Sequence, residues 1–443
     1  MTDEERFYLE RDLRTRECGV ADGFHHVVRV VVGADAAQSP GGQAMVLALV
    51  NMLARIHRSL QLDIPSVGLL TRCLIPANYL DVAAAGLARA IDPYIRLDAG
   101  PASAHAIGIG AAAPSGLPWY AGADGQIAII DQRPVGVPPT PCLTLGGALS
   151  ACLAAAAVLR QVLGVEQRPV RLSAWNYHDG DDAERGPDSL GPLDVGDVLQ
   201  IGAGGVGLCL SYWLREFGVV GTWRIADRDD AVVHNTNRCL GLLARDTAWA
   251  GGAPRNKAVV AAQLFGALPH ACWYDELDHD TFKPDLVLPL ANERNVRHAI
   301  ACRGEPVILH ATTSRTWEAQ LHRHRPDSDD CITCRMPSPT SEVAFGCATV
   351  RLETSTALPS TDAALPFLSA TAALLLVSGL YLLQFEQIAD EPYNFWAVCF
   401  RDVRRHVRRA ICSCRDGCAT VLPGNVRRRI HVGRRWSHLD HWA

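Results

Sequence analysis

The chain has 443 residues, a net charge of −5 at pH 7, and a composition that is 48% hydrophobic and 20% charged. This length predicts two domains, and the apolar share is enough to fill a substantial core. The small negative charge argues against a protein that binds nucleic acid broadly or lies on a membrane surface.

The chain opens on MTDEERFYLERDLR, a charged segment that lacks the apolar stretch of a secretory signal. It also contains fifteen cysteines. Without a leader, that many thiols indicate a reducing compartment, where cysteine serves metal binding or chemistry rather than disulfide bonds. We therefore expect a cytoplasmic protein.

Strands and helices alternate through the first half. Residues 26–33 (HVVRVVVG) form a continuous β-branched run, which is typical of a strand buried on both faces. Two glycines, Gly41 and Gly42, precede an apolar-periodic helix over residues 43–56. Further strands are expected at residues 64–67, 104–110 and 126–130, and an Ala-rich helix at residues 146–164.

A polar stretch, residues 176–191 (NYHDGDDAERGPDSLG), is interpreted as a linker. It divides the chain into an N-terminal domain of residues 1–190 and a C-terminal domain of residues 191–443. The second domain repeats the order of the first, with a strand, a glycine turn and a helix at one end and a long apolar helix at the other. Alternating strands and helices of this kind predict the α/β class.

The apolar helix of the second half covers residues 366–385 and is long enough to resemble a membrane span. It contains the polar or small residues Ser369, Thr371, Ser378 and Gly379. We expect a buried core helix here, with a membrane span as the alternative.

A glycine turn in the second half carries the clearest chemical signal. Gly202, Gly204 and Gly207 form a G-x-G-x-x-G motif directly after an apolar strand and open an amphipathic helix. A second apolar strand ends in Asp227, twenty residues past the last glycine. Such glycines let the backbone approach phosphates at a helix N-terminus, and the carboxylate at the strand end accepts hydrogen bonds from ribose hydroxyls. The motif predicts a nucleotide site, and a hydride-transfer enzyme would share it.

The residues that follow are not typical of a dehydrogenase. Asn235, Asn237 and Arg238 form an N-x-N-R patch, and Lys257 comes shortly after it. The chain has only one other lysine, Lys283. Two fixed cations near a phosphate cradle suit triphosphate chemistry better than hydride transfer.

At these residues the chain resembles the ubiquitin-activating enzyme superfamily, which includes the bacterial ThiF-like adenylyltransferases that charge sulfur-carrier proteins. That family has a ribose-binding aspartate, an arginine in an N-x-N-R-Q motif, and then a lysine. Asp227, Arg238 and Lys257 match in that order, with Cys239 in place of the glutamine and a longer stretch before the lysine. The resemblance covers residues 193–443, and the first half more faintly. It implies a Rossmann-like fold that uses ATP, and it makes Asp229 and Asn235 further candidate contacts.

The same resemblance raises a question about magnesium. The strand at residues 285–290 leads into Asn292 and Glu293, where the family has an aspartate associated with the Mg²⁺ of ATP. A neutral amide is a poorer Mg²⁺ ligand than a carboxylate. Either Glu293 takes over the metal, or the metal is held differently, or adenylation is weak.

The first half lacks the glycine fingerprint, the N-x-N-R patch and any lysine. Eukaryotic members of the family pair an active adenylation domain with an inactive one, so the resemblance implies an intrachain pseudo-dimer. An unrelated α/β domain would show much the same periodicity. The segment from Glu10 to Arg14 is similar to a family D-R-Q-L-R segment that reaches across the pair. That similarity makes Arg11 a candidate contact to the triphosphate, with Arg14 as a fallback, although a charged opening helix is also typical of a solvated face.

Several cysteines have the spacing of metal ligands. Cys331 and Cys334 form a C-x-x-C pair, and Cys412, Cys414 and Cys418 follow far downstream. Four thiolates in two close pairs suit tetrahedral structural Zn²⁺, and the family carries zinc in these regions. We favour Cys414 and Cys418 as the second pair. Unpaired thiols or a redox pair are the alternatives.

Cys347 lies thirteen residues beyond the C-x-x-C pair and belongs to neither pair. Family members that carry a modifier as a thioester have a cysteine in this loop, in motifs similar to Cys347-Ala348-Thr349. A nucleophilic cysteine needs a thiolate and access. A buried apolar cysteine is the competing interpretation.

The resemblance implies an enzyme that adenylates the C-terminus of a bacterial ubiquitin-like (β-grasp) protein, forms a thioester on Cys347, and passes the modifier to a conjugating-enzyme-like protein. A role in antiphage defence is a guess by resemblance. The alternatives are an adenylyltransferase for a sulfur-carrier protein, a non-catalytic nucleotide-binding scaffold, and, more distantly, a dinucleotide oxidoreductase. Nucleic acid and membranes are not expected partners, and the sequence leaves open whether the chain forms a homodimer.

Overall fold

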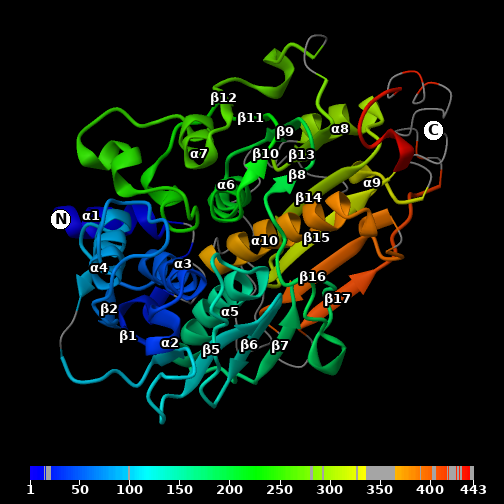
Figure 1. Ribbon diagram of the computed structural model, residues 1–443. Coiled ribbons are helices and arrows are strands. Elements are labelled where there is room, and N and C mark those ends of the chain that lie inside the picture. The colour runs from blue at the N-terminus through cyan, green and yellow to red at the C-terminus, as the bar shows by residue number, and fades with distance from the viewer. Residues whose placement is uncertain are drawn as a thin grey trace.

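The computed structural model describes residues 1–13, 15, 21–97, 100–279, 283–291, 294–325, 328–335, 365–389, 391–401, 406–416, 418, 426, 429 and 432–439. Strands and helices alternate along these residues. The strands form two large sheets, one in each half of the chain (Figure 1). The predicted α/β class is confirmed.

In the described part of the first half, seven strands form one sheet: β1 (Val27–Val32), β2 (Ser59–Asp63), β3 (Arg96–Leu97), β4 (Ala106–Ile109), β5 (Trp119–Asp124), β6 (Ile127–Asp131) and β7 (Val170–Ser173). Their order is β3-β2-β1-β4-β5-β6-β7. Neighbours from β3 to β5 are parallel, and β5, β6 and β7 are antiparallel.

The described strands of the second half form an eight-stranded sheet: β9 (Val198–Ile201), β11 (Trp223–Ala226), β12 (Leu268–His270), β13 (Leu286–Pro289), β14 (Ile308–Thr313), β15 (Glu318–His324), β16 (Phe395–Cys399) and β17 (Val407–Ala410). Their order is β12-β11-β9-β13-β14-β15-β16-β17. The strands from β12 to β14 are parallel and the last four are antiparallel. Two short strands, β8 (Leu193–Asp194) and β10 (Val219–Val220), pair separately.

The two sheets therefore share one plan. In each, the first strand is central, the next two lie on one side of it, and the chain then crosses to the other side. This crossing creates a switch point at the carboxyl ends of β1 and β4 in the first sheet and of β9 and β13 in the second. Ligands of open α/β sheets bind in the crevice at such a point.

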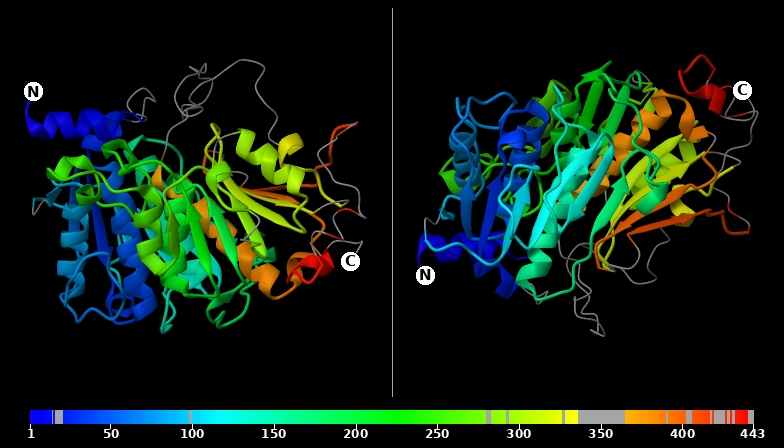
Figure 2. Two further views of the ribbon diagram at one scale, coloured as in Figure 1. Left: turned by 90° about the horizontal axis from the view of Figure 1, so that it is seen from above. Right: turned by 60° about the horizontal axis from the view of Figure 1, so that its bottom comes forward.

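Helices from both halves pack between the sheets (Figures 1 and 2). They are α3 (Pro40–Ile56), α5 (Leu145–Val162), α6 (Gly205–Phe217) and α10 (Pro366–Gln384). The helix α5 lies on β5 and β6, α10 lies on β14 and β15, and these two helices contact each other. One hydrophobic cluster consequently runs through both halves.

Both α5 and α10 are apolar enough to cross a membrane by length and composition, but 89% and 100% of their apolar windows are buried inside the protein. A helix that is apolar all round is expected in the core of a large protein. The prediction of a buried core helix at residues 366–385 is confirmed, and the Ala-rich helix of the first half is buried in the same way.

The remaining described helices are α1 (Asp3–Arg11), α2 (Ala34–Ala37), α4 (Leu80–Ile91), α7 (Lys257–Phe265), α8 (Arg294–Arg303) and α9 (Ile332–Arg335). Short 3₁₀ turns include η4 (Val233–Asn235) and η5 (Ala244–Asp246). The helix α1 packs against η4 of the second half.

One predicted strand is in the wrong place. Residues 64–67 form no strand, and β2 ends at Asp63, where its parallel register with β1 pairs Val31 with Asp63. Pro65 follows, and its missing N–H cannot continue a ladder. The strand β5 and the antiparallel strands β15 to β17 were not predicted.

The predicted boundary at residues 190–191 lies between β7 and β8. The preceding segment is not a loose linker. Tyr177 is 3% exposed, and its hydroxyl donates to the carbonyl of Leu375 on α10 at 3.4 Å. An aromatic ring seated on the core ties this stretch to the helices between the sheets.

Candidate functional site

The glycine turn lies at the switch point of the second sheet. Gly202 follows β9 with φ +98, a backbone conformation that favours glycine. A Cβ there would stand 2.7 Å from the backbone nitrogen of Ala291, just past β13. A Cβ on Gly207 would stand 2.2 Å from the carbonyl oxygen of Gly202. The helix α6 starts at Gly205, and in the described part of the chain Gly204 provides no side-chain cap for its first N–H groups.

Asp227 stands beside this turn, one residue past β11. Its carboxylate accepts hydrogen bonds from the backbone N–H of Ala203 at 2.6 Å and of Asp229 at 2.9 Å. Burial raises the pKa of the Asp227 carboxyl, and these N–H groups and nearby Lys257 partly oppose the rise. The acid is therefore held at the edge of the glycine turn.

Arg238 lies over the start of α6. A Cβ built on Gly205 would be 3.3 Å from its Cδ and 3.5 Å from its Nε. The guanidinium is nearly buried, and Nη1 donates to the carbonyl of His234 at 2.8 Å and to Oδ1 of Asn237 at 3.1 Å. A cation placed over the first turn of an uncapped helix adds to the positive end of its dipole, which favours an anion there.

Asn235 is occupied by its own turn. Its Oδ1 accepts from the backbone N–H of Val232 at 3.1 Å, and the residue is buried. This contact stabilises η4 and gives no sign of a ligand contact. Two residues further along, Nδ2 of Asn237 is buried and has no hydrogen-bond partner among the described residues. Because an unpaired buried donor is costly, Asn237 is the better candidate for a polar contact to a ligand.

Lys257 is the first residue of α7. Its Nζ lies 2.8 Å from Oδ2 of Asp229, and its side chain is 11% exposed, whereas that of Asp229 is 60% exposed. The preceding Asn256 caps α7, and its Nδ2 donates to the carbonyls of Asp227, Arg228 and Asp229. Asn256 therefore joins the helix of Lys257 to the strand end of Asp227. We did not predict this role, although an asparagine directly before a helix is a recognisable cap signal.

Arg11 is held by carboxylates of the first half, and its predicted contact with a triphosphate stays a prediction. Its guanidinium is fully buried, with ion pairs to Asp12 and Asp92 at 2.7 Å each and a hydrogen bond to the carbonyl of Ile56 at 3.3 Å. Because such a buried pair is costly to break, the side chain stabilises the packing of α1 on the first half. The fallback, Arg14, lies outside the described residues.

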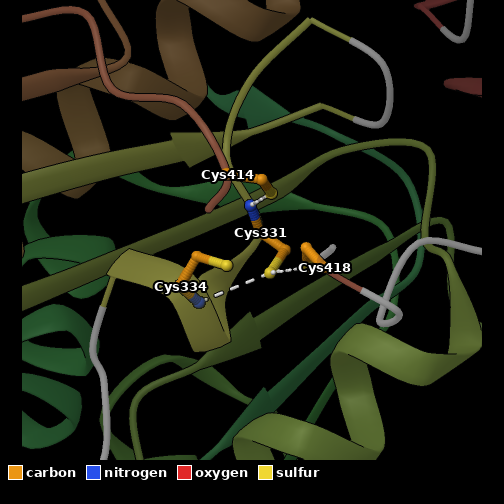
Figure 3. Close-up of side chains that lie close together, drawn as sticks. All are labelled: Cys331, Cys334, Cys414 and Cys418. Carbon is orange, nitrogen blue, oxygen red and sulfur yellow. Dashed lines mark hydrogen bonds between the residues drawn. The ribbon is translucent and has the colours of Figure 1, made fainter. Parts of the chain in front are cut away.

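Four cysteines come together at the far end of the second sheet. The sulfur atoms of Cys331, Cys334, Cys414 and Cys418 lie within 4.8 Å of one another (Figure 3). Sulfurs around a tetrahedral Zn²⁺ are about 3.8 Å apart for Zn–S bonds of about 2.3 Å. The donor set and spacing therefore fit structural zinc. Cys412 is not in this group, because its backbone is paired with the side chain of Asn394.

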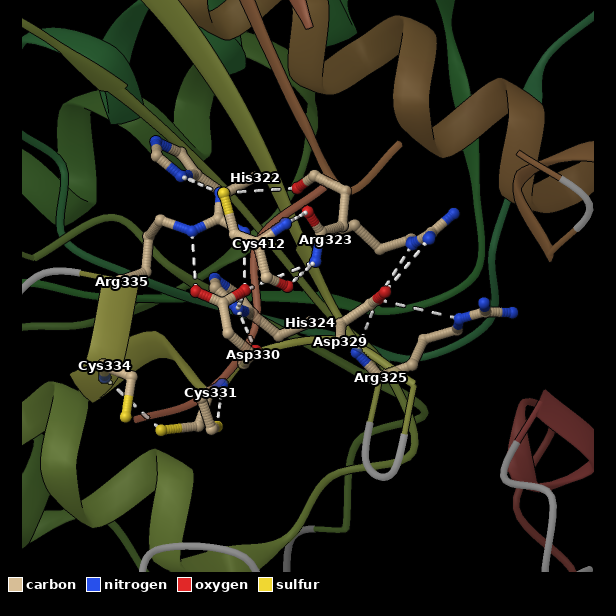
Figure 4. A network of polar contacts seen from close by, with 12 residues as sticks. His322, Arg323, His324, Arg325, Asp329, Asp330, Cys331, Cys334, Arg335 and Cys412 are labelled. Atoms are coloured by element: carbon tan, nitrogen blue, oxygen red, sulfur yellow. Dashed lines mark hydrogen bonds and ion pairs between the residues drawn. The ribbon is translucent and has the colours of Figure 1, made fainter. Parts of the chain in front are cut away.

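A polar network behind the cluster fixes the C-x-x-C segment (Figure 4). Asp330 forms an ion pair with Arg335 and lies 3.5 Å from the imidazole of His324. Burial raises the pKa of the Asp330 carboxyl, but hydrogen bonds from His324 and Arg335 outweigh it and lower the pKa to about 2. Arg323 meanwhile pairs with Asp329 through two hydrogen bonds. Outer contacts of this kind orient metal ligands.

Three predicted site residues fall outside the described part of the chain. They are the candidate nucleophile Cys347 and the candidate magnesium contacts Asn292 and Glu293.

No protein-family model and no curated protein matches the chain. Several solved structures of E. coli MccB are similar to it. One, with AMPCPP and MccA, is 14% identical over 52% of this chain and 67% of that chain, at a TM-score of 0.39. Another, of the microcin C7 biosynthetic enzyme MccB with N-formylated MccA, is 14% identical over 51% and 67%, at a TM-score of 0.37. Likeness at this level concerns the fold alone.

Proposed function

We propose that the second half binds ATP and adenylates the C-terminal carboxylate of another polypeptide. The observation that carries the proposal is the convergence of three features at the carboxyl edge of β9 and β11. They are the uncapped glycine turn that opens α6, the Arg238 guanidinium over Gly205, and the Asp227 carboxylate bonded to Ala203. Together they provide a place for phosphates and a polar acceptor for ribose.

In the proposed reaction, a carboxylate oxygen of the substrate attacks the α-phosphorus of ATP. The bond between the α-phosphorus and the bridging oxygen breaks, pyrophosphate leaves, and an acyl adenylate remains. Because two anions must meet, the site must neutralise charge and hold the phosphates in line. Arg238 and Lys257 would supply that charge, and Lys257 would exchange its contact with the exposed Asp229 for one with a phosphate.

The substrate is proposed to be a ubiquitin-like β-grasp protein, on the strength of the sequence resemblance. In a second step, the thiolate of Cys347 would attack the acyl carbon and release AMP, leaving a thioester for transfer to a conjugating-enzyme-like protein. Mg²⁺ would accompany ATP, and Zn²⁺ would be held by the four cysteines. The shared strand order of the two sheets supports the view that the first half is an inactive adenylation-like domain paired with the second.

The test is ATP–pyrophosphate exchange with purified candidate β-grasp proteins, each compared with a version that lacks its last two residues. We expect exchange that needs the intact C-terminus and is lost in Arg238→Ala. Lys283→Ala is the matched control because Lys283 is exposed and is the only other lysine of the chain. Absence of both nucleotide binding and exchange would refute the proposal.

A non-reducing gel then separates the finer alternatives. A thiol-sensitive adduct that disappears in Cys347→Ala supports thioester transfer. Exchange without an adduct supports an adenylyltransferase for a sulfur-carrier protein, and nucleotide binding without exchange supports a scaffold.

A further inference from the structure

A buried arginine of the first half contacts the second half next to the proposed site. Arg55 is near the end of α3 and is 1% exposed. Its Nη1 donates to the carbonyl of Thr236 at 2.6 Å, and its Nη2 donates to the carbonyls of Leu240 and Leu242 at 2.8 Å each. Asn51, one turn earlier, accepts from Nε of Arg55 at 2.9 Å and donates to Leu240 at 3.1 Å.

The partners of this cation are unusual, because all of them are neutral oxygens. Among the described residues, no carboxylate forms an ion pair with Arg55. Burial lowers the pKa of its guanidinium to about 10, which measures how unfavourable the site is for a charge. A charge buried at such a cost needs strong hydrogen bonds to be tolerated, and three carbonyl oxygens from one loop provide them.

The loop that Arg55 binds is the one that carries Arg238. Residues 236–243 lie between η4 and η5 and contain no helix or strand to hold them. The carbonyls of Thr236 and Leu240 are two residues before and two residues after Arg238. Within the loop, the backbone N–H of Arg238 donates to Asn235, and its carbonyl accepts from the Cys209 thiol at 3.3 Å.

We propose that Arg55 is a positioning residue. It holds the backbone on both sides of Arg238, so that the guanidinium of Arg238 stays over the start of α6. The first half would then act on the nucleotide site of the second half through one fixed cation, in addition to covering its core. The catalytic part of this inference rests on the proposed adenylation; the structural part does not.

Arg55→Met removes the donors but keeps the length of the side chain. Arg160→Met is the matched control. Arg160 is likewise buried, at 3% exposed, on an interface helix, and it donates across the interface to the carbonyl of Phe400, away from the loop of Arg238. Both variants are expected to lower Tm. Only Arg55→Met is expected to speed hydrogen exchange at the amides of residues 238–242, by at least tenfold, and to lower kcat/KM for ATP by at least tenfold.

A double variant tests whether Arg55 acts through Arg238. If it does, Arg55→Met adds no more than a twofold loss of nucleotide affinity on an Arg238→Met background, because the group that it positions is already gone. Should Arg55→Met fail to fold, Arg55→Lys keeps the charge with fewer donors and is expected to give intermediate exchange rates and activity.

Unchanged hydrogen exchange in the loop, or faster exchange with unchanged kcat/KM, would overturn the inference. A wild-type protein that neither binds nor turns over ATP would instead refute the proposed function. In that case the comparison of amide exchange between the Arg55 and Arg160 variants would still decide whether Arg55 anchors the loop.

Discussion

The two switch points of the molecule share a strand order but are filled in opposite ways. In the first half, the carboxylate of Asp35, two residues past Gly33, accepts from the backbone N–H groups of Ala111 at 2.7 Å and Ala112 at 3.0 Å. A Cβ on Gly110 would lie 2.4 Å from Asp35. The gap between β1 and β4 is thus bridged by an acid of the chain itself.

In the second half, no side chain bridges the corresponding gap in the described residues. Gly202 stands directly against Ala291, and α6 starts without a side-chain cap. By contrast, α3 is capped by Ser39, whose hydroxyl accepts from Gly42. In the first half, the N–H groups at the end of β4 are bonded to the Asp35 carboxylate. In the second half, the start of α6 has no side-chain cap at Gly204, and the buried cation of Arg238 lies beside it. The same strand order can therefore give a switch point that is filled by a side chain of the protein or one that is able to bind an anion, depending on a few polar side chains.

Removal of the metal is expected to produce the largest difference between the halves, because only the second contains the four-cysteine group among the described residues. We expect one zinc per chain by elemental analysis. Cys331→Ser should lose it, with a loss of stability of several kcal/mol, because binding energy at structural zinc is folding energy, about 10 kcal/mol or more in small peptides. Cys412→Ser should keep the metal. Metal retained in Cys331→Ser would disprove the assignment.

The next largest effect should come from Lys257→Ala. It removes a cation from the proposed phosphate site, and pyrophosphate exchange should fall by about 10²–10³-fold, as for the loss of one preorganised group that stabilises developing charge. Lys283→Ala should retain wild-type exchange. Equal losses of exchange in both variants would show that Lys257 has no specific role at the proposed phosphate site.

Two isosteric changes compare the switch points directly. Asp35→Asn should destabilise the protein by about 1.5–3 kcal/mol in urea denaturation, because it removes charge-assisted hydrogen bonds, and should leave ATP affinity unchanged. Asp227→Asn should weaken ATP binding about tenfold, because an amide oxygen is a poorer acceptor than a carboxylate for the ribose hydroxyls that are proposed to bind there. The reverse pattern in calorimetric titrations would assign the nucleotide to the first half.

The last comparison concerns the dependence of stability on pH. Burial lowers the pKa of His57 in the first half to about 3, with nearby Arg11 as the second cause. The folded protein then binds fewer protons than the unfolded chain between pH 3 and 6.5, so stability falls as the pH drops below 6.5, by up to about 1.4 kcal/mol per unit for this group. His57→Leu should flatten the dependence of urea stability on pH between 6 and 4. An unchanged slope would show that His57 is not buried as a neutral ring.

Much of the fold was predictable where local pattern and burial agree. The runs at residues 26–33 and 198–201 are apolar and β-branched enough to be buried parallel strands, and both are strands in the structure. The prediction failed at residues 64–67, because apolar content there did not reflect register with β1. It also missed β15 to β17, where His322 packs against Phe395 and Arg323 donates to the carbonyls of Ile388 and Glu391, all from distant segments.

The candidate site divides in the same way. The order of Asp227, Arg238 and Lys257, and the cysteine spacing, are local signals that could be read from the chain. The surroundings of Arg11 could not be predicted, because a charge pattern does not reveal that Arg11 forms a buried ion pair with Asp92, far along the chain. Arg55 left only a faint signal, an arginine with an asparagine four residues earlier in an otherwise apolar helix.

The sequence by itself determined the α/β class, the position of the glycine turn and the cysteines able to form one cluster, because these depend on periodicity, backbone freedom and donor type. Tertiary structure alone decided that Asp35 bridges the first switch point, that Arg11 forms a buried ion pair with Asp92, and that Arg55 donates to carbonyls in the loop of Arg238. Each of these depends on which distant carbonyl or carboxylate meets a buried charge, and neighbouring residues in the chain do not specify that.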